Sequence, residues 1–429
     1  MNVLESVNAA LSGTVLPIFL MIAGLVLGRR EKFFYILHPA KLVHDLKDAA
    51  AGGGVSPARA LSVALAGTLG VGNISGVAAA IGSGGAGAVF WMWICGILVM
   101  SVKYAEVYLS QEYRQRGANG YYGGAMYYMR DGLRRRLGRR IACAVAAIFA
   151  FLIASNSILT GNIVQVNAAA SVFSKIPPIY CGTAFAVIAA ITAAGGLRRV
   201  SDLTVRMIPL LSLAYIMLSV AAIIHCRSRL GSAFRDIFAG AFRFEAAAGG
   251  VFGFGISRAV RFGITRGIFS NEAGCGTAPS AHAAAAAKSP HHQGCMGIFE
   301  VFADTIVLCT MTALVMLTCD AGGTEFGIGE VMAAFGDALG SWAAVVIGIS
   351  VVLFALATVV CQSYYGICAI KYFTDARSAR FLYIAFFSAS SVIGSIISSG
   401  VMWQLADLII ALLTVINMGC VLAIFKKKL

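Results

Sequence analysis

Long apolar runs alternate with short polar connections along nearly the whole chain. A stretch of roughly 20 apolar residues is long enough to cross a bilayer as an α-helix. Such stretches lie near residues 11–28, 61–83, 88–112, 141–173, 181–197, 207–226, 249–268, 294–318, 341–372, 381–399 and 402–425. The pattern therefore predicts an all-α integral membrane protein with about eleven transmembrane helices.

The composition agrees with this interpretation. Hydrophobic residues make up 59% of the 429 residues and charged residues only 12%, and the mean hydropathy is +0.83. A water-soluble domain carries about 25% charged residues. The net charge of +14 comes from basic clusters between the apolar runs, where such clusters set the orientation of the spans. We therefore expect this chain to lie in a lipid bilayer and to have no nucleic-acid partner.

The basic connections predict an orientation in the membrane. They are RREK at 29–32, the Arg-rich stretch 114–140, RRVSDLTVR at 198–206, the loop 282–292, KYFTDARSAR at 371–380 and the tail 426–428. With the amino terminus outside, all of them fall on the cytoplasmic side, as the positive-inside rule requires. We expect a multi-pass protein of the cell (inner or plasma) membrane with a cytoplasmic carboxy terminus. The basic stretch 227–248 is the exception, and we expect it to form an amphipathic helix on the outer membrane surface.

Two glycine motifs interrupt the apolar runs. GTLGVG (67–72) lies in the second span and GVFGFG (250–255) in the seventh, so the two segments cross the membrane in opposite directions. Because each glycine weakens a helix by about 1 kcal/mol relative to alanine, we expect both helices to be broken. Matching broken helices in two inverted halves are typical of secondary transporters, which bind substrate and ions at the breaks. Helix packing through glycine is the alternative explanation.

The two motifs also predict the organisation of the chain. Residues 1–60 would form an extra first helix and its cytoplasmic connection, and residues 61–226 the first repeat of five helices. Residues 227–248 would form the amphipathic external connection, and residues 249–429 the second repeat. The predicted fold is thus a five-plus-five inverted repeat with broken second and seventh helices.

Several longer motifs resemble one known family, the alanine/glycine:cation symporters. They are GTLGVGNISGVAAAI (67–81), AVFWMWI (88–94), KYAEVYL (103–109), GGAMYYM (123–129), FSNEAGCGTAP (269–279) and MWQLADLI (402–409). The resemblance runs from the second span to the eleventh. It implies a sodium-coupled symporter, not an enzyme, that imports alanine or glycine by alternating access. It also implies the inverted-repeat fold of the leucine transporter.

The resemblance implies two sodium sites at the first break. Thr68 and Asn73 would face a sodium ion beside the substrate. A second sodium ion would meet the carbonyl groups of Ala66 and Leu69 and the hydroxyl of Thr358. The coupling ion, Na⁺, is thus an expected ligand together with the amino acid.

The resemblance also implies a substrate site. The backbone of Gly70 and Gly72 would meet the substrate carboxylate, and Gln165 matches a glutamine expected to bind substrate. In the seventh span, residues of the second glycine motif would line the space for the amino-acid side chain: Phe252, Gly253 and Gly255. Gln362 occupies a position where the family commonly has tryptophan, and we include it among the residues that face the substrate.

Departures from the family pattern leave alternatives open. Ala357 removes one of two hydroxyl groups usual beside the second sodium site, and Ile367 replaces a frequent carboxylate. Ala125 replaces a proline, and Cys275 a methionine. The alternatives are a symporter for a different or larger amino acid, or a proton-coupled one. A channel would need a continuous polar stripe, and a membrane-embedded enzyme would need a nucleophile–base pair or metal spacing.

A few polar residues lie in or near the spans. Lys103 and Glu106 are three residues apart, so we expect them to form a structural ion pair on one helix face. Asp304 lies within an apolar run and is either functional or paired with an arginine. Asn271 and Glu272 are expected to cap a short helix.

The loop after the seventh span contains His282, His291 and His292. No ordered set of cysteines accompanies them, so we expect solvated histidines in a mobile loop and not a metal site.

Overall fold

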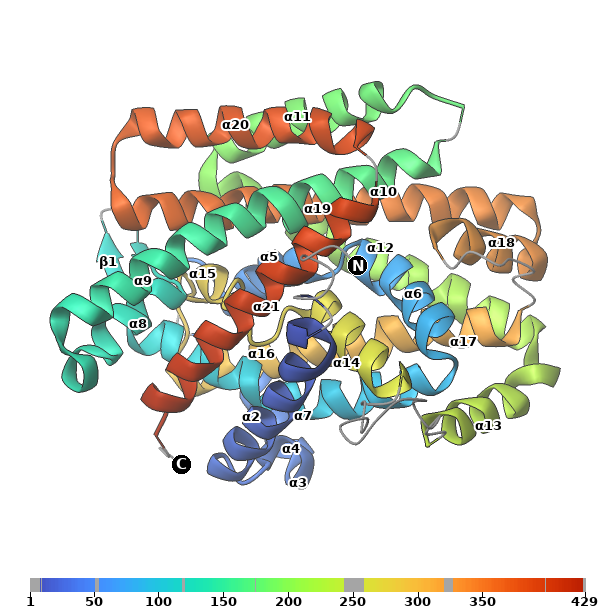
Figure 1. The fold of residues 1–429 in the computed structure, drawn as a ribbon, viewed down its shortest axis with the longest axis horizontal. Helices are drawn as coiled ribbons and strands as arrows, with labels where there is room; N and C mark the ends of the chain where they lie inside the picture. The colour runs from blue at the N-terminus through green and yellow to red at the C-terminus, as the bar shows by residue number, and fades with distance from the viewer. Residues whose placement is uncertain are drawn as a thin grey trace.

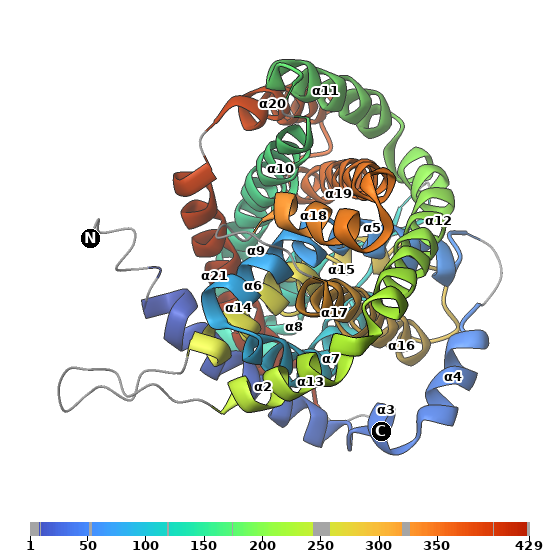
Figure 2. The ribbon, with the colours of Figure 1, turned by 90° about the vertical axis from the view of Figure 1, so that its right-hand side faces the viewer.

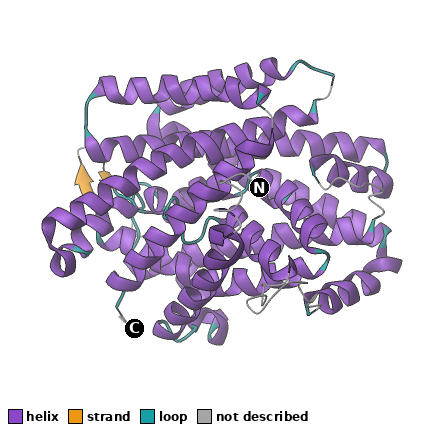
Figure 3. Ribbon diagram, in the orientation of Figure 1, coloured by secondary structure: helices purple, strands orange, loops and turns teal. Residues whose placement is uncertain are grey.

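The protein is built almost entirely of helices, as the sequence predicts (Figures 1 and 3). The computed structural model describes residues 8, 10–50, 54–117, 120–173, 175–242, 258–319, 327–397 and 399–426. Within these residues the only strands are β1 (Gln115–Gly117) and β2 (Gly120–Tyr122), which pair antiparallel with Arg116 opposite Tyr121.

Eight helical segments of the described residues are long and apolar enough to cross a membrane. They are Leu11–Arg30 (η1 and α2), Gly87–Glu112 (α7), Arg134–Val172 (α9, η3 and α10), Gly196–His225 (α12), Pro290–Thr318 (α16, η5 and α17), Ser341–Phe373 (α19), Arg377–Ile396 (α20) and Met402–Ile424 of α21 (Ser399–Ile424). Each overlaps a span predicted from the sequence. The chain is therefore an integral membrane protein with many spans.

The second predicted span is broken. Helix α5 (Pro57–Thr68) and the segment Val71–Gly84, which contains η2 (Val71–Asn73) and α6 (Ser75–Gly84), meet at an angle of 60°. Gly70 between them has an extended backbone, with φ −125° and ψ −150°. This confirms the break predicted at GTLGVG. The second motif, GVFGFG, lies outside the described residues, and the helix after it is α14 (Arg258–Asn271).

The remaining helices are short or lie in connections. They are α3 (Phe34–Leu37), α4 (Pro39–Lys47), α8 (Ala125–Gly132), α11 (Pro178–Ala194), η4 (Arg227–Arg229), α13 (Leu230–Ala241), α15 (Pro279–His282) and α18 (Ile328–Leu339). Helix α11 is apolar and matches the predicted span 181–197.

The helices form layers around the broken span. Helices α11 and α20 lie side by side on one outer face, with α19 and α10 beneath them (Figures 1 and 2). Helices α5, α6 and α14 lie in the middle, and α7 and α2 lie on the opposite side (Figure 2). The break is therefore enclosed by protein, and Leu69, Val71 and Asn73 are all buried.

Helix α13 lies in the connection predicted to be amphipathic. Its buried side chains are Ala233, Ile237 and Ala241, and the indole Nε1 of Trp91 in α7 donates a hydrogen bond to the Ala241 carbonyl (2.8 Å). A Cβ atom on Gly87 would collide with the backbone of Gly240. Small residues thus allow α13 to lie directly on the start of α7.

We expect Gly87→Ala to destabilise the protein by about 1–3 kcal/mol, because the added methyl group forces the two backbones apart. Thermal unfolding of the purified protein in detergent measures this. The matched control is Gly231→Ala at the start of α13, where an added Cβ meets no atom within 4 Å. Equal midpoints of thermal unfolding for Gly87→Ala and Gly231→Ala would contradict the close contact between α7 and α13.

Candidate functional site

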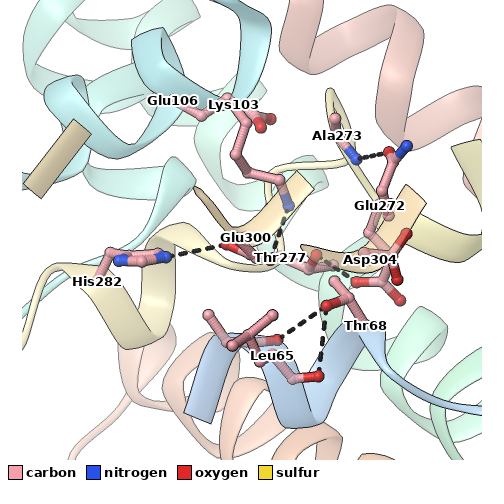
Figure 4. Close-up of polar contacts among 12 residues, drawn as sticks. Leu65, Thr68, Lys103, Glu106, Glu272, Ala273, Thr277, His282, Glu300 and Asp304 are labelled. Carbon is pink, nitrogen blue, oxygen red and sulfur yellow. Dashed lines mark hydrogen bonds and ion pairs between the residues drawn. The ribbon is translucent and has the colours of Figure 1, made fainter. Parts of the chain in front are cut away.

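The break in α5–α6 exposes backbone groups inside the protein. Thr68 is the last residue of α5, and its hydroxyl lies near the carbonyl groups of Ala64 (3.3 Å) and Leu65 (3.4 Å), as Figure 4 shows for Leu65. Beyond it the helical hydrogen bonds stop at Leu69 and Gly70. Inside a membrane protein such groups need partners from the protein, from water in a cavity or from a ligand.

Two residues proposed by the resemblance lie directly at this break. The Gln165 side chain (α10) accepts a hydrogen bond through Oε1 from the Val71 N–H (3.1 Å). The Thr358 hydroxyl (α19) lies 3.5 Å from the Leu69 carbonyl oxygen. A Cβ atom on Gly70 would lie 2.6 Å from Thr358 Oγ1 and 2.7 Å from Gln165 Oε1. Three distant parts of the sequence therefore meet around one glycine.

Asp304 is also part of this region. It lies in the π-helical segment η5 (Phe302–Cys309), and Asn73 donates a hydrogen bond through Nδ2 to its Oδ1 atom (2.7 Å). The hydroxyl groups of Ser270 and Thr305 donate to Oδ2 (2.9 and 2.8 Å). Among the described residues no arginine pairs with Asp304. The structure thus connects the Asp304 carboxylate to the break. The sequence alone had left two roles for this residue, a functional one or a pair with an arginine.

Asn73 has one polar atom without a partner. Its Oδ1 atom is buried and makes no hydrogen bond with the described residues. Buried polar atoms are rarely left unsatisfied, and carboxylate and amide oxygens together are suitable ligands for hard cations. Asn73 Oδ1 and the Asp304 carboxylate could therefore contribute to a cation site.

A narrow crevice lies beside the break. It is lined by Leu69, Gly70, Asn73, Ile74, Tyr215, Leu308 and Phe354. Tyr215 is held by a hydrogen bond between its hydroxyl and that of Thr312 (2.7 Å), which in turn donates to the Asn73 carbonyl (2.8 Å). Sequence reasoning missed Tyr215, Leu308 and Phe354, because nothing distinguishes them locally from other residues of apolar spans.

The other predicted site residues make different contacts. Gln362 is one helical turn beyond Thr358, and its Nε2 donates to Glu272 Oε1 (2.9 Å). A Cβ on Gly72 would lie 3.1 Å from the Cα of Ser270, so this glycine faces α14. Ala66 is fully buried in the last turns of α5. Phe252, Gly253 and Gly255 lie outside the described residues.

Lys103 and Glu106 do not pair with each other as expected. The Lys103 Nζ atom binds Glu300 Oε1 (3.1 Å), and both side chains are completely buried (Figure 4). Glu106 instead accepts hydrogen bonds from the N–H groups of Gly274 (3.1 Å) and Gly276 (2.9 Å). The expectation was wrong because packing of α16 and the loop 272–278 against α7 provides closer partners than the helix itself.

The expectation of solvated histidines in a mobile loop was wrong for His282, while His291 and His292 are partly exposed in the first turn of α16. His282 is completely buried, and its Nε2 lies 3.0 Å from Glu300 Oε2 (Figure 4). Its Nδ1 lies 2.7 Å from Gln293 Nε2. The loop is fixed because α7 binds its backbone: Gln111 donates to the carbonyl groups of His282 and Ala285.

Asn271 and Glu272 do not cap a short helix as expected. Asn271 ends α14 and its Oδ1 accepts from the Ala273 N–H (2.9 Å) in the turn that follows, Glu272 accepts from the Thr277 hydroxyl, and α15 begins after Ala278 without a side-chain cap.

Comparison with known proteins places these features in a family. A model of the sodium:alanine symporter family matches residues 1–429. The chain belongs to this family. Its named relatives are symporters and carriers, so this family member is a transporter and not an enzyme.

Two relatives have informative names. The sodium/alanine symporter AgcS of Methanococcus maripaludis is 34% identical over 421 residues, which cover 95% of this chain and 90% of that protein. The probable sodium/glutamine symporter GlnT of Bacillus subtilis is 32% identical over 427 residues, which cover 98% of this chain and 87% of that protein. The family thus includes members named for amino acids of different size.

Solved structures show the fold. The crystal structure of MhsT in complex with L-phenylalanine has a TM-score of 0.57 at 14% identity, covering 87% of this chain and 89% of that chain. A Na⁺-coupled sialic acid symporter has a TM-score of 0.50 at 14% identity, covering 97% of this chain and 86% of that chain. The family member described here therefore has the inverted-repeat fold of the leucine transporter, as predicted.

We expect Lys103→Met to lower the free energy of unfolding of this family member by about 3–5 kcal/mol, because it leaves Glu300 buried without its cation. The double variant Lys103→Met/Glu300→Gln should recover much of that loss. Thermal unfolding of both variants in detergent measures the coupling.

The matched control is the exposed pair of Arg59 and Asp202, whose side chains are 3.0 Å apart and about half exposed. Arg59→Ala should change stability by about 0–1 kcal/mol. If Lys103→Met behaved like this control, the buried pair would not stabilise the fold.

Proposed function

We propose that the protein is a sodium-coupled symporter that imports a small neutral amino acid, alanine or glycine, by alternating access. One observation carries the proposal: the unwound turn at Gly70 lies between the Thr358 hydroxyl and the Gln165 amide. An unwound helix offers N–H groups to a carboxylate and carbonyl groups to a cation in the same place.

One sodium ion would bind at the carbonyl groups of Ala66 and Leu69 and the hydroxyl of Thr358. The Thr358 hydroxyl donates to the Phe354 carbonyl of its own helix (3.1 Å), and its oxygen lies 3.5 Å from the Leu69 carbonyl oxygen. This supports the assignment, because two oxygen atoms at this separation can bind the same cation. The family usually has hydroxyl groups at both positions 357 and 358. Because Ala357 has none, this sodium site would depend on the hydroxyl of Thr358.

A second sodium ion would bind beside the substrate at Thr68 and Asn73. The unpartnered Asn73 Oδ1 and the neighbouring Asp304 carboxylate support this assignment. We add Asp304 to the proposed site, because a buried carboxylate surrounded by neutral donors is stabilised by a nearby cation.

The substrate carboxylate would meet the backbone of Gly70 and Gly72, with Gln165 as a side-chain partner. The side chain of the amino acid would lie toward Tyr215 and Phe354 on one side and toward the second glycine motif on the other: Phe252, Gly253 and Gly255. Gln362 is bound to Glu272 in this structure. It would contact the substrate in a state of the transport cycle in which that hydrogen bond is broken.

The proposed topology follows the basic connections. The amino terminus would lie outside and the carboxy terminus in the cytoplasm of the inner or plasma membrane. The repeats would be residues 61–226 and 249–429, with residues 1–60 as an added helix and its connection, and residues 227–248 as an external amphipathic connection.

Uptake into proteoliposomes tests the function. An inward sodium gradient should drive accumulation of labelled alanine or glycine, and replacement of sodium by potassium should abolish it. An imposed proton gradient serves as the alternative driving force, and glutamine as the larger competing substrate. Accumulation driven by protons alone, or competition by glutamine but not by alanine, would contradict the proposed ion or substrate.

We expect Thr358→Ala to raise the sodium concentration for half-maximal uptake by about 5- to 150-fold, as a lost ligand to a charge costs about 1–3 kcal/mol. Thr358→Ser keeps the hydroxyl group and should remain close to the parent. An unchanged sodium requirement in Thr358→Ala would remove this residue from the ion site.

We also expect Gly70→Ala to reduce uptake about tenfold or more, because the methyl group must displace Thr358 Oγ1 and Gln165 Oε1 at a cost of about 1–3 kcal/mol. The matched control is Gly76→Ala, beyond the break, where an added Cβ meets no atom within 4 Å. Initial uptake rates at equal amounts of reconstituted protein measure the difference. Normal uptake by Gly70→Ala would show that ligands do not bind at the break.

A further inference from the structure

Three side chains with metal-binding atoms converge at a place separate from the break. They are Asp45 of α4, His291 of α16 and Cys295 of α16. Their ligand atoms all lie within 4.8 Å of one another. His291 and Cys295 are four residues apart on one helix, so both face the same side, and α4 lies against that side (Figure 2).

The spacing of these atoms suits zinc. His291 Nε2 lies 3.1 Å from Asp45 Oδ2 and 3.9 Å from Cys295 Sγ. Tetrahedral zinc with ordinary bond lengths places nitrogen and oxygen about 3.4 Å apart, and nitrogen and sulfur about 3.6 Å apart. The Asp45 carboxylate and the Cys295 thiol lie within 4.8 Å of each other, and tetrahedral zinc would bring them to about 3.6 Å.

The imidazole ring of His291 is already oriented. Its Nδ1 lies 2.7 Å from the Tyr104 hydroxyl, and its ring packs against Phe34, with ring centroids 5.4 Å apart. A metal-binding histidine usually has such a partner on its other nitrogen, because this bond fixes the direction of the ligand atom. Nε2 is thereby directed at Asp45 and Cys295.

A second observation also indicates a cation. A cavity of about 200 Å³ adjoins the cluster and is lined by His291, Tyr104 and Glu31. Glu31 is 1% exposed, and neither of its carboxylate oxygens has a hydrogen-bond partner among the described residues. Arg30 also borders the cavity, but its guanidinium group donates to the carbonyl groups of Leu422 and Phe425.

We propose that Asp45, His291 and Cys295 bind a divalent transition-metal ion, zinc in the first place. The neighbouring cavity has room for several waters, at about 30 Å³ each, and so provides an entry path and a fourth ligand. The bound ion would connect α4, which follows the first span, to α16, which begins the span that contains Glu300 and Asp304. The site would make the attachment of these two helices dependent on metal.

Cobalt titration of the purified, chelator-treated full-length protein tests the site. Binding of one equivalent of Co²⁺ should give a thiolate charge-transfer band, and Zn²⁺ should displace it. Cys295→Ser should lose the band. His291→Ala and Asp45→Asn should bind Zn²⁺ at least about 10- to 100-fold more weakly. This is the loss that follows when a residue hydrogen-bonded to a metal ligand is removed, and loss of the ligand itself should cost no less.

Two matched controls accompany these variants. His292→Ala removes the adjacent histidine, and Cys181→Ser removes a cysteine of α11, and both should bind like the parent. Zn²⁺ should also raise the thermal midpoint of the parent and not that of Cys295→Ser. Cys295→Ser or His291→Ala could fail to fold, because both change residues of α16. In that case Asp45→Asn, in the short helix α4, still tests whether the cluster binds metal.

Three results would overturn the proposal. They are the absence of stoichiometric cobalt binding by the parent, an unchanged charge-transfer band in Cys295→Ser, and an equal loss of affinity in His292→Ala and His291→Ala.

Discussion

The interior of a bilayer offers no water to an interrupted helix, and the rest of this structure depends on that constraint. Each unpaired backbone group in hydrocarbon costs several kcal/mol. At the break after Thr68 the protein provides one partner from each of three spans: Thr358 beside the Leu69 carbonyl, Gln165 for the Val71 N–H and Thr312 for the Asn73 carbonyl. One unwound turn thereby joins α19, α10 and α17 at the break.

The same constraint explains the buried charges of α7 and α16. The loop after α14 turns through Gly274 and Gly276, both at positive φ (90° and 72°), and their N–H groups would otherwise lack partners. Glu106 accepts from both, while Lys103, Glu300 and His282 satisfy one another nearby. The two irregular segments of the core are thus held by side chains that belong to regular helices.

Apolar run length and glycine content predicted the spans and the first break, because both are local properties. The family resemblance added Gln165 and Thr358. The periodicity of the sequence does not indicate that these two residues lie at the break. The partners of Lys103 and the burial of His282 could not be predicted, because they depend on contacts between residues about 200 and 20 positions apart that form only after the helices pack. Tyr215 and Phe354 were missed for a related reason: in a helix that is apolar on every side, sequence does not show which side faces a ligand.

The continuous span from Pro290 to Thr318 contributes His291, Glu300 and Asp304 to three different sets of contacts. These sets connect it to α4, α7, η2 and α14. A packed helix moves as a rigid rod and cannot rotate or slide without disturbing contacts along its whole length. Any tilt of this rod would therefore disturb its contacts with Lys103 of α7, with Ser270 of α14 and with Asn73 at the break all at once.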